Sequence, residues 1–376
     1  MASADGTSSA STLTSVADVL VAMSGGVDST VAALVLQREG YDIAGVTMKL
    51  IGRDVLEDEE GSKCCSLDDV LDAKSACRKL GVEHFTFNFK SDFKHDVVDR
   101  FCSSYLSGQT PNPCIDCNRY LKFSGLQRRR RELGAKYVAT GHYARRRFDD
   151  ETGRWQLLRA ADKAKDQSYV LYHLTQDDLK HMLFPLGELE KSQVRELARE
   201  AGFDNAEKSE SQDICFVPDG DYASFISRYT GSKAGTLLDE PGQIVDKDGN
   251  VLGTHNGLAR YTIGQRKGIG VASPEPLYVW DKDIENNLLV VAPRSGLFVS
   301  EATLEDVNVI SGEAGSATHS ADFKTGYRQQ LTPGTIELAG DGTALIEFAE
   351  PVVRPAPGQS VVAYEGDVVL GGGTVS

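Results

Sequence analysis

The chain has 376 residues, a formal net charge of −15 and a sequence isoelectric point near 5.0. This length predicts two or three domains, because a single hydrophobic core rarely grows beyond about 250–300 residues. No apolar run reaches the roughly 18 residues that a transmembrane helix needs. The first fifteen residues, "MASADGTSSASTLTS", lack the features of a signal or transit peptide, so we expect a disordered tail and a cytoplasmic protein.

The first predicted unit is strand, turn, helix, strand. Residues 18–23 form an apolar run, "SGGVDS" follows, and "STVAALVLQRE" is typical of a helix that ends at Gly40. The next strand is "DIAGVTMKL". Such a βαβ unit predicts a parallel sheet.

The alternation continues along the chain. We expect a helix over "SLDDVLDAKSACRKL", a strand at "HFTFNF", a helix near 92–106, a loop "SGQTPNPCIDC", a basic helix over about 118–133 and a strand "KYVAT". Ligands of parallel sheets bind at the carboxyl ends of the strands. The glycine turn, "MKL", "PNPCIDC" and "TGHY" should therefore converge there.

The pattern changes after about residue 208, where short Gly-punctuated segments replace the helices. Alternating apolar runs and turns from residue 282 onward predict a small β-barrel. We therefore expect a tail at 1–17, an α/β nucleotide-binding domain at 18–208, a small mostly β central domain at 209–281 and a C-terminal β-barrel at 282–376.

The glycine turn has the composition of an anion site. A strand that runs through Ser24-Gly25-Gly26 into a helix directs backbone N–H groups and the helix dipole at one point. The lysine of a G-x-x-x-x-G-K-[ST] loop is missing. A loop of this kind suits pyrophosphate leaving as a unit, which favours adenylation over γ-phosphoryl transfer. The alternative is a tight βα turn that binds nothing.

The stretch "SGGVDS" resembles the signature of the PP-loop ATP pyrophosphatase superfamily, whose members activate an oxygen with AMP. Further blocks, in one order along the chain, resemble bacterial tRNA-specific 2-thiouridylases. They are "TPNPCIDCNRYLKF", "ATGHYARR", "KDQSYVLY", "LFPLGELEKSQVRE", "SQDICF", "YTIGQRKGIG" and "PGQSVVAY". The resemblance implies an ATP-dependent sulfurtransferase that makes 2-thiouridine at the wobble position of the tRNAs for Lys, Glu and Gln, releasing AMP and pyrophosphate.

The resemblance also implies site residues. Cys215 would carry a persulfide supplied by a cysteine desulfurase or a sulfur-relay protein, and Cys117 would resolve it as the nucleophile, leaving a Cys117–Cys215 disulfide for a reductant. The positions that match ATP contacts, with Mg²⁺ accompanying the nucleotide, are Ala22, Met23, Ser24, Gly25, Gly26, Val27, Asp28, Ser29, Met48 and Gly141. The positions that match target-base or tRNA contacts are Asn112, Pro113, Cys114, His142, Lys165, Asp166, Gln167, Tyr327 and Gln359.

Some of these residues have a second interpretation. Met48 either packs on adenine or fills the core, and Asp28 would help to arrange Mg²⁺. Gly326 stands beside Tyr327 where the family usually has arginine. The basic run from 118 to 147 has ten Lys/Arg and one acid; it is either a solvated helix face, which this run alone favours slightly, or a surface for phosphates.

The cysteines include one departure from the family. Many members have aspartate where this chain has Cys114, and we expect the nearby Asp116 to point elsewhere. Cys114, Cys117 and Cys215 could instead hold an iron–sulfur cluster of the 4Fe-4S type, or Cys114 could only pack. Of the remaining cysteines, Cys64 and Cys65 are expected to be loop or packing thiols, and Cys77 and Cys102 to be core residues.

Two other functions fit parts of the sequence. A PP-loop ligase that forms amides would need no cysteine pair. A tRNA-binding protein without catalysis would keep the glycine stretch as a structural turn. Pyrophosphate release from ATP and substitution of Cys215 distinguish these alternatives from a thiolase.

Overall fold

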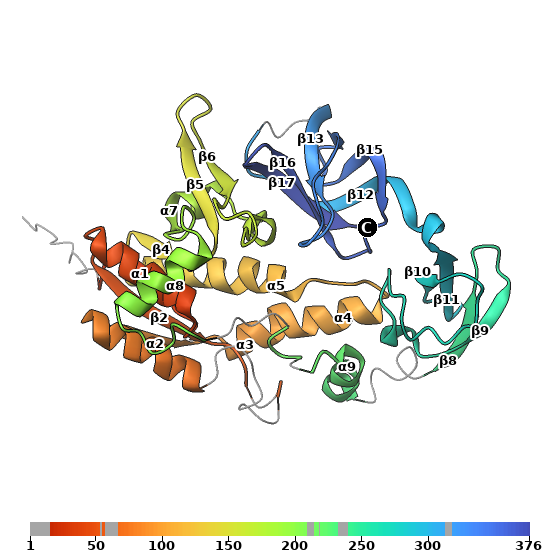
Figure 1. Ribbon diagram of the computed structural model, residues 1–376, viewed down its shortest axis with the longest axis horizontal. Helices are drawn as coiled ribbons and strands as arrows, with labels where there is room; N and C mark the ends of the chain where they lie inside the picture. The colour runs from red at the N-terminus through yellow and green to blue at the C-terminus, as the bar shows by residue number, and fades with distance from the viewer. Residues whose placement is uncertain are drawn as a thin grey trace, which may run out of the picture.

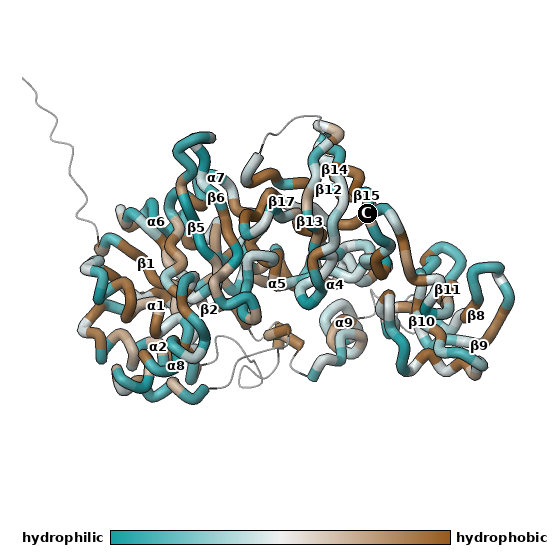
Figure 2. The backbone as a smooth tube through the Cα atoms, turned by 45° about the horizontal axis from the view of Figure 1, so that its top comes forward, coloured by the Kyte–Doolittle hydropathy of each residue, from teal (hydrophilic) through white to brown (hydrophobic). Residues whose placement is uncertain are grey.

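A computed structural model describes residues 16–52, 55–56, 67–208, 214–217, 219–231, 240–312 and 318–376 (Figure 1). Its first domain is built on a five-stranded parallel sheet with the order β3-β2-β1-β4-β7. The strands are β1 (Val19–Ala22), β2 (Ile43–Lys49), β3 (His84–Asn88), β4 (Tyr137–Ala139) and β7 (Met182–Leu183). Strands β1 and β2 are almost entirely buried, as their apolar sequences predict (Figure 2).

Helices α1 (Val27–Arg38), α2 (Leu67–Leu80) and α8 (Lys191–Glu200) pack around this sheet. Two longer helical stretches run side by side toward the other domains (Figure 1). The first joins α3 (Lys90–Phe93), the π-helical η2 (Lys94–Asp99) and α4 (Arg100–Leu106). The second joins α5 (Pro113–Asp116), the π-helical η3 (Cys117–Phe123) and α6 (Ser124–Glu132). No helix within the described ranges has the length and apolar character needed to cross a membrane.

The expected loop "SGQTPNPCIDC" was wrong in its second half, because the helix begins at Pro113. The Asn112 side chain accepts a hydrogen bond from the Cys114 N–H at 3.1 Å, and proline is suited to the first helical position. Cys114 and Cys117 therefore lie on a helix.

A hairpin of β5 (Ala144–Asp149) and β6 (Arg154–Arg159) leaves the first domain and joins the C-terminal sheet, where Leu158 pairs with Val368. Its tip is hydrophilic (Figure 2). The 3₁₀ helix η4 (Ser168–Leu171) and α7 (Gln176–His181) follow.

The central domain contains α9 (Tyr222–Thr230), η6 (Leu258–Arg260) and a sheet of order β10-β11-β8-β9. These strands are β8 (Pro241–Val245), β9 (Val251–Asn256), β10 (Leu277–Asp283) and β11 (Leu288–Pro293). The predicted boundary at 281/282 falls inside β10, and the strand pairing favours a division after β11. The domain boundaries themselves stay predictions.

The C-terminal domain is a closed barrel, which confirms the predicted architecture. After η7 (Arg294–Leu297), its strands are β12 (Phe298–Val309), β13 (Thr318–Lys324), β14 (Thr332–Leu338), β15 (Ala344–Val353), β16 (Ser360–Glu365) and β17 (Val368–Val375). They follow the order β12-β15-β14-β13-β16-β17, and β12 pairs with β17 to close the barrel.

Candidate functional site

The glycine loop joins β1 to α1 at the carboxyl edge of the sheet. Ser29 Oγ donates to the Gly26 carbonyl at 3.0 Å and accepts from the Ser24 N–H at 3.2 Å. The Asn205 amide donates to the Gly25 carbonyl at 3.0 Å, and Gly25 has a φ of 76°. These contacts hold the loop at the N-terminus of a twelve-residue helix, the geometry that binds phosphate groups.

Two glycines allow the chain to pack closely around this loop. A Cβ on Gly25 would lie 2.4 Å from the Asp69 carbonyl oxygen. A Cβ on Gly141 would lie 2.8 Å from both the Asp28 carbonyl carbon and the Ser29 nitrogen. Gly141, predicted from the "ATGHYARR" block, therefore lies against the first turn of α1.

Asp28 is held by two residues that the sequence analysis did not single out. Lys191 Nζ lies 2.7 Å and 2.8 Å from its two carboxylate oxygens, and the Tyr143 hydroxyl donates to Oδ1 at 2.8 Å. Lys191 lies within the block "LFPLGELEKSQVRE", the only sequence signal that could have indicated it. The carboxylate expected to arrange Mg²⁺ is thus paired with a lysine ammonium in this structure.

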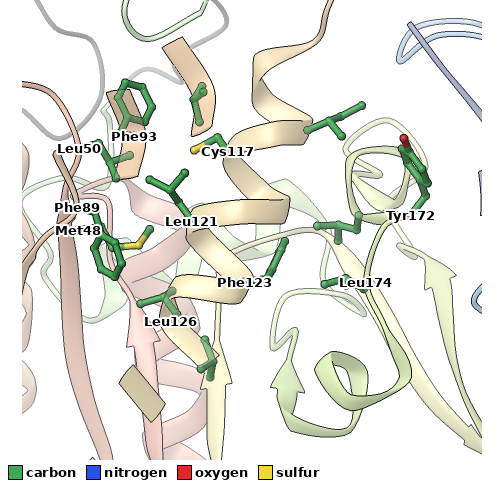
Figure 3. Packing of buried hydrophobic residues seen from close by; sticks show 14 of the residues in the cluster. Met48, Leu50, Phe89, Phe93, Cys117, Leu121, Phe123, Leu126, Tyr172 and Leu174 are labelled. Carbon is green, nitrogen blue, oxygen red and sulfur yellow. The ribbon is translucent and has the colours of Figure 1, made fainter. Parts of the chain in front are cut away.

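The other predicted nucleotide residues divide between the loop and the core. Val27 is the first residue of α1, and Ala22 is the last residue of β1. Met23 follows β1, and its N–H donates a hydrogen bond to the Val46 carbonyl at 2.8 Å. Met48 is 7% exposed and packs in the apolar cluster beside Phe89 (Figure 3). This burial agrees with core filling.

Cys117 lies at the start of η3 and is 8% exposed, in the same hydrophobic cluster as Leu121 and Phe123 (Figure 3). Cys114, one turn earlier, is exposed. Burial raises the pKa of the intervening Asp116 carboxyl to about 6, and Arg100, whose Nε lies 3.8 Å away, partly offsets this. Asp116 therefore faces α4.

Cys215 is partly buried and packs on the cluster that contains Cys117. Its neighbour Phe216 is 1% exposed, with ring centroids 5.7 Å from Phe93, 5.3 Å from Phe101 and 5.2 Å from Phe225. This aromatic anchor holds the Cys215 segment against α4 and α9. The structure therefore brings both predicted thiols to one cluster, although nearly a hundred residues separate them in the chain.

The described cysteines do not assemble a metal-binding group. Within the described ranges no three His, Cys, Asp or Glu side chains are placed to hold a metal ion, so Cys114, Cys117 and Cys215 do not fit an iron–sulfur cluster in this arrangement. The described cysteines also form no disulfide. Cys77 and Cys102 are buried, and burial raises the thiol pKa to about 11 and about 12 respectively, as expected for core residues. Cys64 and Cys65 lie outside the described residues.

His142 follows the carboxyl end of β4. Its Nδ1 lies 2.8 Å from Thr140 Oγ1, and its ring packs on Phe123 at 5.8 Å between centroids. Burial, reinforced by Lys122, lowers the pKa of His142 to about 3. The ring is therefore neutral near pH 7, which suits hydrogen bonding better than charge pairing.

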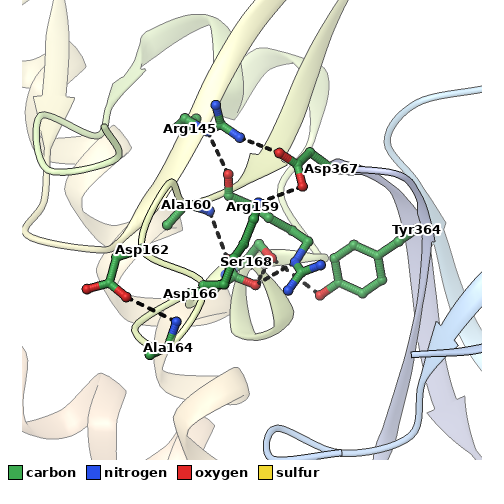
Figure 4. A network of polar contacts seen from close by, with 10 residues as sticks. Arg145, Arg159, Ala160, Asp162, Ala164, Asp166, Ser168, Tyr364 and Asp367 are labelled. Carbon is green, nitrogen blue, oxygen red and sulfur yellow. Dashed lines mark hydrogen bonds and ion pairs between the residues drawn. The ribbon is translucent and has the colours of Figure 1, made fainter. Parts of the chain in front are cut away.

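The segment "KDQ" is largely an internal support. The Asp166 side chain is 1% exposed; it pairs with Arg159 at 3.3 Å and accepts from the Ala160 and Ser168 N–H groups (Figure 4). Gln167 bonds the Tyr143 backbone through both its side chain and its own N–H. Asp166 is buried, whereas Lys165 and Gln167 are both partly exposed.

A cavity of about 570 Å³ lies between the first domain and the barrel. Its charged lining consists of Arg159, Lys163, Asp166, Lys324 and Arg328, and Tyr327 is beside them. The Tyr327 ring is 42% exposed, with Lys324 Nζ 5.5 Å from its centroid. Two predicted tRNA positions, Asp166 and Tyr327, thus line one cavity. The same cavity is lined by basic side chains that the sequence did not indicate, namely Arg159, Lys163, Lys324 and Arg328.

Gln359 links the barrel to the segment before the thiol helix. Its amide donates to the Thr110 carbonyl at 2.5 Å, and the Thr110 N–H donates to the Pro357 carbonyl at 2.8 Å. Gln359 therefore contacts Thr110, two residues before the predicted contact Asn112.

Similarity to known proteins extends along the chain. Residues 17–219 match a family described as tRNA methyl transferase HUP domain, 224–293 a tRNA methyl transferase PRC-barrel domain and 299–375 an aminomethyltransferase beta-barrel domain. The tRNA-specific 2-thiouridylase MnmA of Clostridioides difficile (strain 630) is 44% identical over 357 residues, 95% of this chain and 97% of the relative. That of Heliobacterium modesticaldum is 46% identical over 359 residues, 95% of this chain and 92% of the relative.

Solved structures are more distant. The U34-tRNA thiolase NcsA from Methanococcus maripaludis, solved with its 4Fe-4S cluster, shares 20% identity at a TM-score of 0.33 and covers 59% of this chain and 69% of its own. A similarity this low supports no conclusion about the present chain.

Proposed function

Because the chain belongs to the tRNA-specific 2-thiouridylase family, we propose that it replaces the C2 oxygen of a wobble uridine in the tRNAs for Lys, Glu and Gln by sulfur, at the expense of ATP. The observation that carries this proposal is the packing of Cys117 and Cys215 on one hydrophobic cluster. That cluster also includes Met48, near the carboxyl end of β2.

The first step is adenylation. The uridine O2 attacks the α-phosphorus of ATP, and pyrophosphate leaves as AMP becomes bonded to the base. The loop residues 24–29 and the N-terminus of α1 bind the departing phosphates. Mg²⁺ accompanies the triphosphate, and Asp28, held by Lys191, is the carboxylate of the loop that would face it.

The second step is sulfur transfer. The terminal sulfur of a Cys215 persulfide attacks C2, and AMP leaves with the original oxygen. The Cys117 thiolate then attacks the Cys215 sulfur, which breaks the S–S bond, releases 2-thiouridine and forms the Cys117–Cys215 disulfide. An external thiol reductant returns both cysteines to thiols. No step passes through an iron–sulfur cluster, because the described thiols do not form a ligand set.

The partners follow from this chemistry. We assign tRNA phosphate contacts to the cavity that contains Lys163, Lys324 and Arg328. The target base would enter beside Asn112 and Pro113. The neutral His142, after the end of β4, would serve as a hydrogen-bonding group. A persulfide donor of the cysteine-desulfurase or sulfur-relay class would load Cys215 in the cytoplasm, where tRNA is modified.

Mass spectrometry of tRNA nucleosides tests the proposal. Purified protein is incubated with a tRNA-Lys transcript, ATP, Mg²⁺, dithiothreitol and polysulfide, and 2-thiouridine is quantified together with pyrophosphate. We expect Cys117→Ser and Cys215→Ser to abolish 2-thiouridine but retain pyrophosphate release. Cys102→Ala, in buried α4, serves as the control and should retain both. Product formation by Cys215→Ser, or absence of pyrophosphate release from the unsubstituted protein, would refute the proposal.

A further inference from the structure

One ion pair connects the barrel to the thiol-bearing helix. The Arg119 guanidinium makes two hydrogen bonds to the Asp306 carboxylate, from Nη1 to Oδ2 and, at 3.1 Å, from Nη2 to Oδ1. Arg119 lies on η3, two residues after Cys117, and Asp306 lies on β12 of the barrel. A planar guanidinium with two parallel bonds fixes direction as well as distance.

The backbone at Asp306 is unusual. Its φ is 51°, in the left-handed region, and the register between β12 and β17 shifts between Glu305 and Asn308. A β-bulge of this kind redirects a side chain, at a cost in backbone energy for a residue other than glycine. Here the bulge directs Asp306 toward Arg119.

Stability does not explain this arrangement. The Arg119 and Asp306 side chains are 35% and 54% exposed, and an ion pair so open to solvent contributes little to folding. A small contribution of this kind offers little to offset the left-handed backbone. Strained residues of this type collect at functional sites.

The contacts of η3 indicate what the pair positions. The Asn118 amide donates to the Val170 carbonyl at 3.1 Å, so the first domain holds the residue just after Cys117. The barrel holds the next residue through Asp306. Asn308, two residues along β12, donates to the Tyr172 carbonyl at 2.7 Å, so the same strand also supports the segment that Asn118 contacts. The first turn of η3 is thus fixed from both domains.

We propose that Asp306 is a positioning residue for sulfur transfer, which holds Arg119 and thereby fixes the helical turn that carries Cys117. The inference depends on the nucleophilic role proposed above for Cys117. It predicts that loss of the pair slows the thiol step and spares adenylation, since the glycine loop is held by other residues. The C-terminal barrel is then part of the sulfur-transfer centre as well as a candidate tRNA surface.

Asp306→Asn tests this assignment, because asparagine tolerates the left-handed backbone and removes only the charge. Protein preloaded with polysulfide is mixed with a tRNA-Lys transcript and ATP, and single-turnover 2-thiouridine formation is followed beside pyrophosphate release. We expect thiolation to slow by roughly tenfold, because misplacing a reacting group by about 1 Å can cost up to ~100-fold, with pyrophosphate release unchanged within about twofold. Glu305→Gln, on the same strand, is the matched control and should match the unsubstituted protein.

A second variant, at the other end of the ion pair, distinguishes loss of the pair from misfolding of one variant. Arg119→Gln should slow the same step by a similar factor, and the double variant should be no slower than either single one, because both remove one interaction. Unchanged thiolation in Asp306→Asn, or equal slowing of thiolation and pyrophosphate release, would overturn the assignment. Retained thiolation in Cys117→Ser would instead refute the role of the thiol, so the two failures are distinguishable.

Discussion

Lys191 forms an ion pair with Asp28 at the glycine loop, with Nζ 2.7 Å from Oδ1 and 2.8 Å from Oδ2. The Lys191 side chain is 11% exposed and that of Asp28 is 29% exposed, so solvent screens the pair only partly. A carboxylate beside a phosphate site would repel the incoming anion. The Lys191 ammonium, on α8, neutralises the charge of Asp28 in the first turn of α1.

Lys191→Met should therefore weaken ATP use. Removing the ammonium leaves a partly buried carboxylate next to the triphosphate. Repulsion of about 1–3 kcal/mol corresponds to a loss of about 5- to 150-fold in kcat/KM for ATP-dependent pyrophosphate release. The measurement is pyrophosphate release against ATP concentration. Lys136→Met is the control, since Lys136 pairs with Asp18 at the surface and its side chain is 69% exposed. Equal ATP kinetics in both variants would contradict the role given to Lys191.

Gly141→Ala should damage the same step for a steric reason. The added Cβ would lie 2.8 Å from backbone atoms of Asp28 and Ser29, which cannot move without shifting the first turn of α1. We expect at least about tenfold slower pyrophosphate release, because the loop N–H groups lose their alignment on the phosphates. Gly153→Ala, in open space at the hairpin turn, adds backbone strain without this clash and should leave the rate unchanged. A normal rate in Gly141→Ala would mean that α1 tolerates the shift.

The sequence predicted the elements whose signals are local. The apolar run before "SGGVDS" and the glycines after each helix indicated the βα units, and alternating apolar segments indicated the barrel. The helix start at Pro113 was missed because "TPNP" is typical of a turn, whereas here Asn112 caps a helix.

Contacts between distant segments could not be read from local patterns. Lys191 meets Asp28 across 163 positions, and the β5–β6 hairpin joins β17 of the barrel. The burial of single side chains could not be predicted from the sequence either. The letters "KDQ" do not indicate that Asp166 is buried while Lys165 is partly exposed. Only the assembled fold separates the enclosed residue from the partly exposed one.

The pair Lys165 and Asp166 gives a direct test of that separation. Asp166→Asn loses the charge that pairs with Arg159 and leaves buried N–H donors poorly matched, so we expect a loss of about 2–4 kcal/mol in the free energy of unfolding. Lys165→Gln should leave stability within about 0.5 kcal/mol and weaken tRNA binding, with a smaller salt dependence. Urea unfolding and filter binding at several salt concentrations measure the two effects. The assignment fails if Asp166→Asn is as stable as the unsubstituted chain.

His173 is a buried histidine whose pKa depends on the fold. It is 8% exposed, and its ring centroid lies 5.9 Å from that of Phe123. Neither of its ring nitrogens has a hydrogen-bond partner among the residues that the structure describes. Burial first, and Arg119 second, lower the pKa of His173 to about 3, while Asp306 acts in the opposite direction. The folded chain therefore keeps this ring neutral well below the pH at which the unfolded chain protonates it.

The sign of the pH effect follows from this difference. Between the unfolded pKa of about 6.5 and the folded value of about 3, the unfolded state binds more protons, so acid destabilises the fold. His173→Leu removes this linkage and two unpaired nitrogens. We expect a gain of about 1 kcal/mol in the free energy of unfolding at pH 8, and about 2 kcal/mol more at pH 5. His95→Gln, at a ring whose side chain is 83% exposed, is the control for urea unfolding at both pH values and should show no such increase. A His173→Leu gain that is the same at pH 5 and pH 8 would mean that the ring can be protonated in the folded chain, so its enclosure between Phe123 and Tyr172 would have to open in acid.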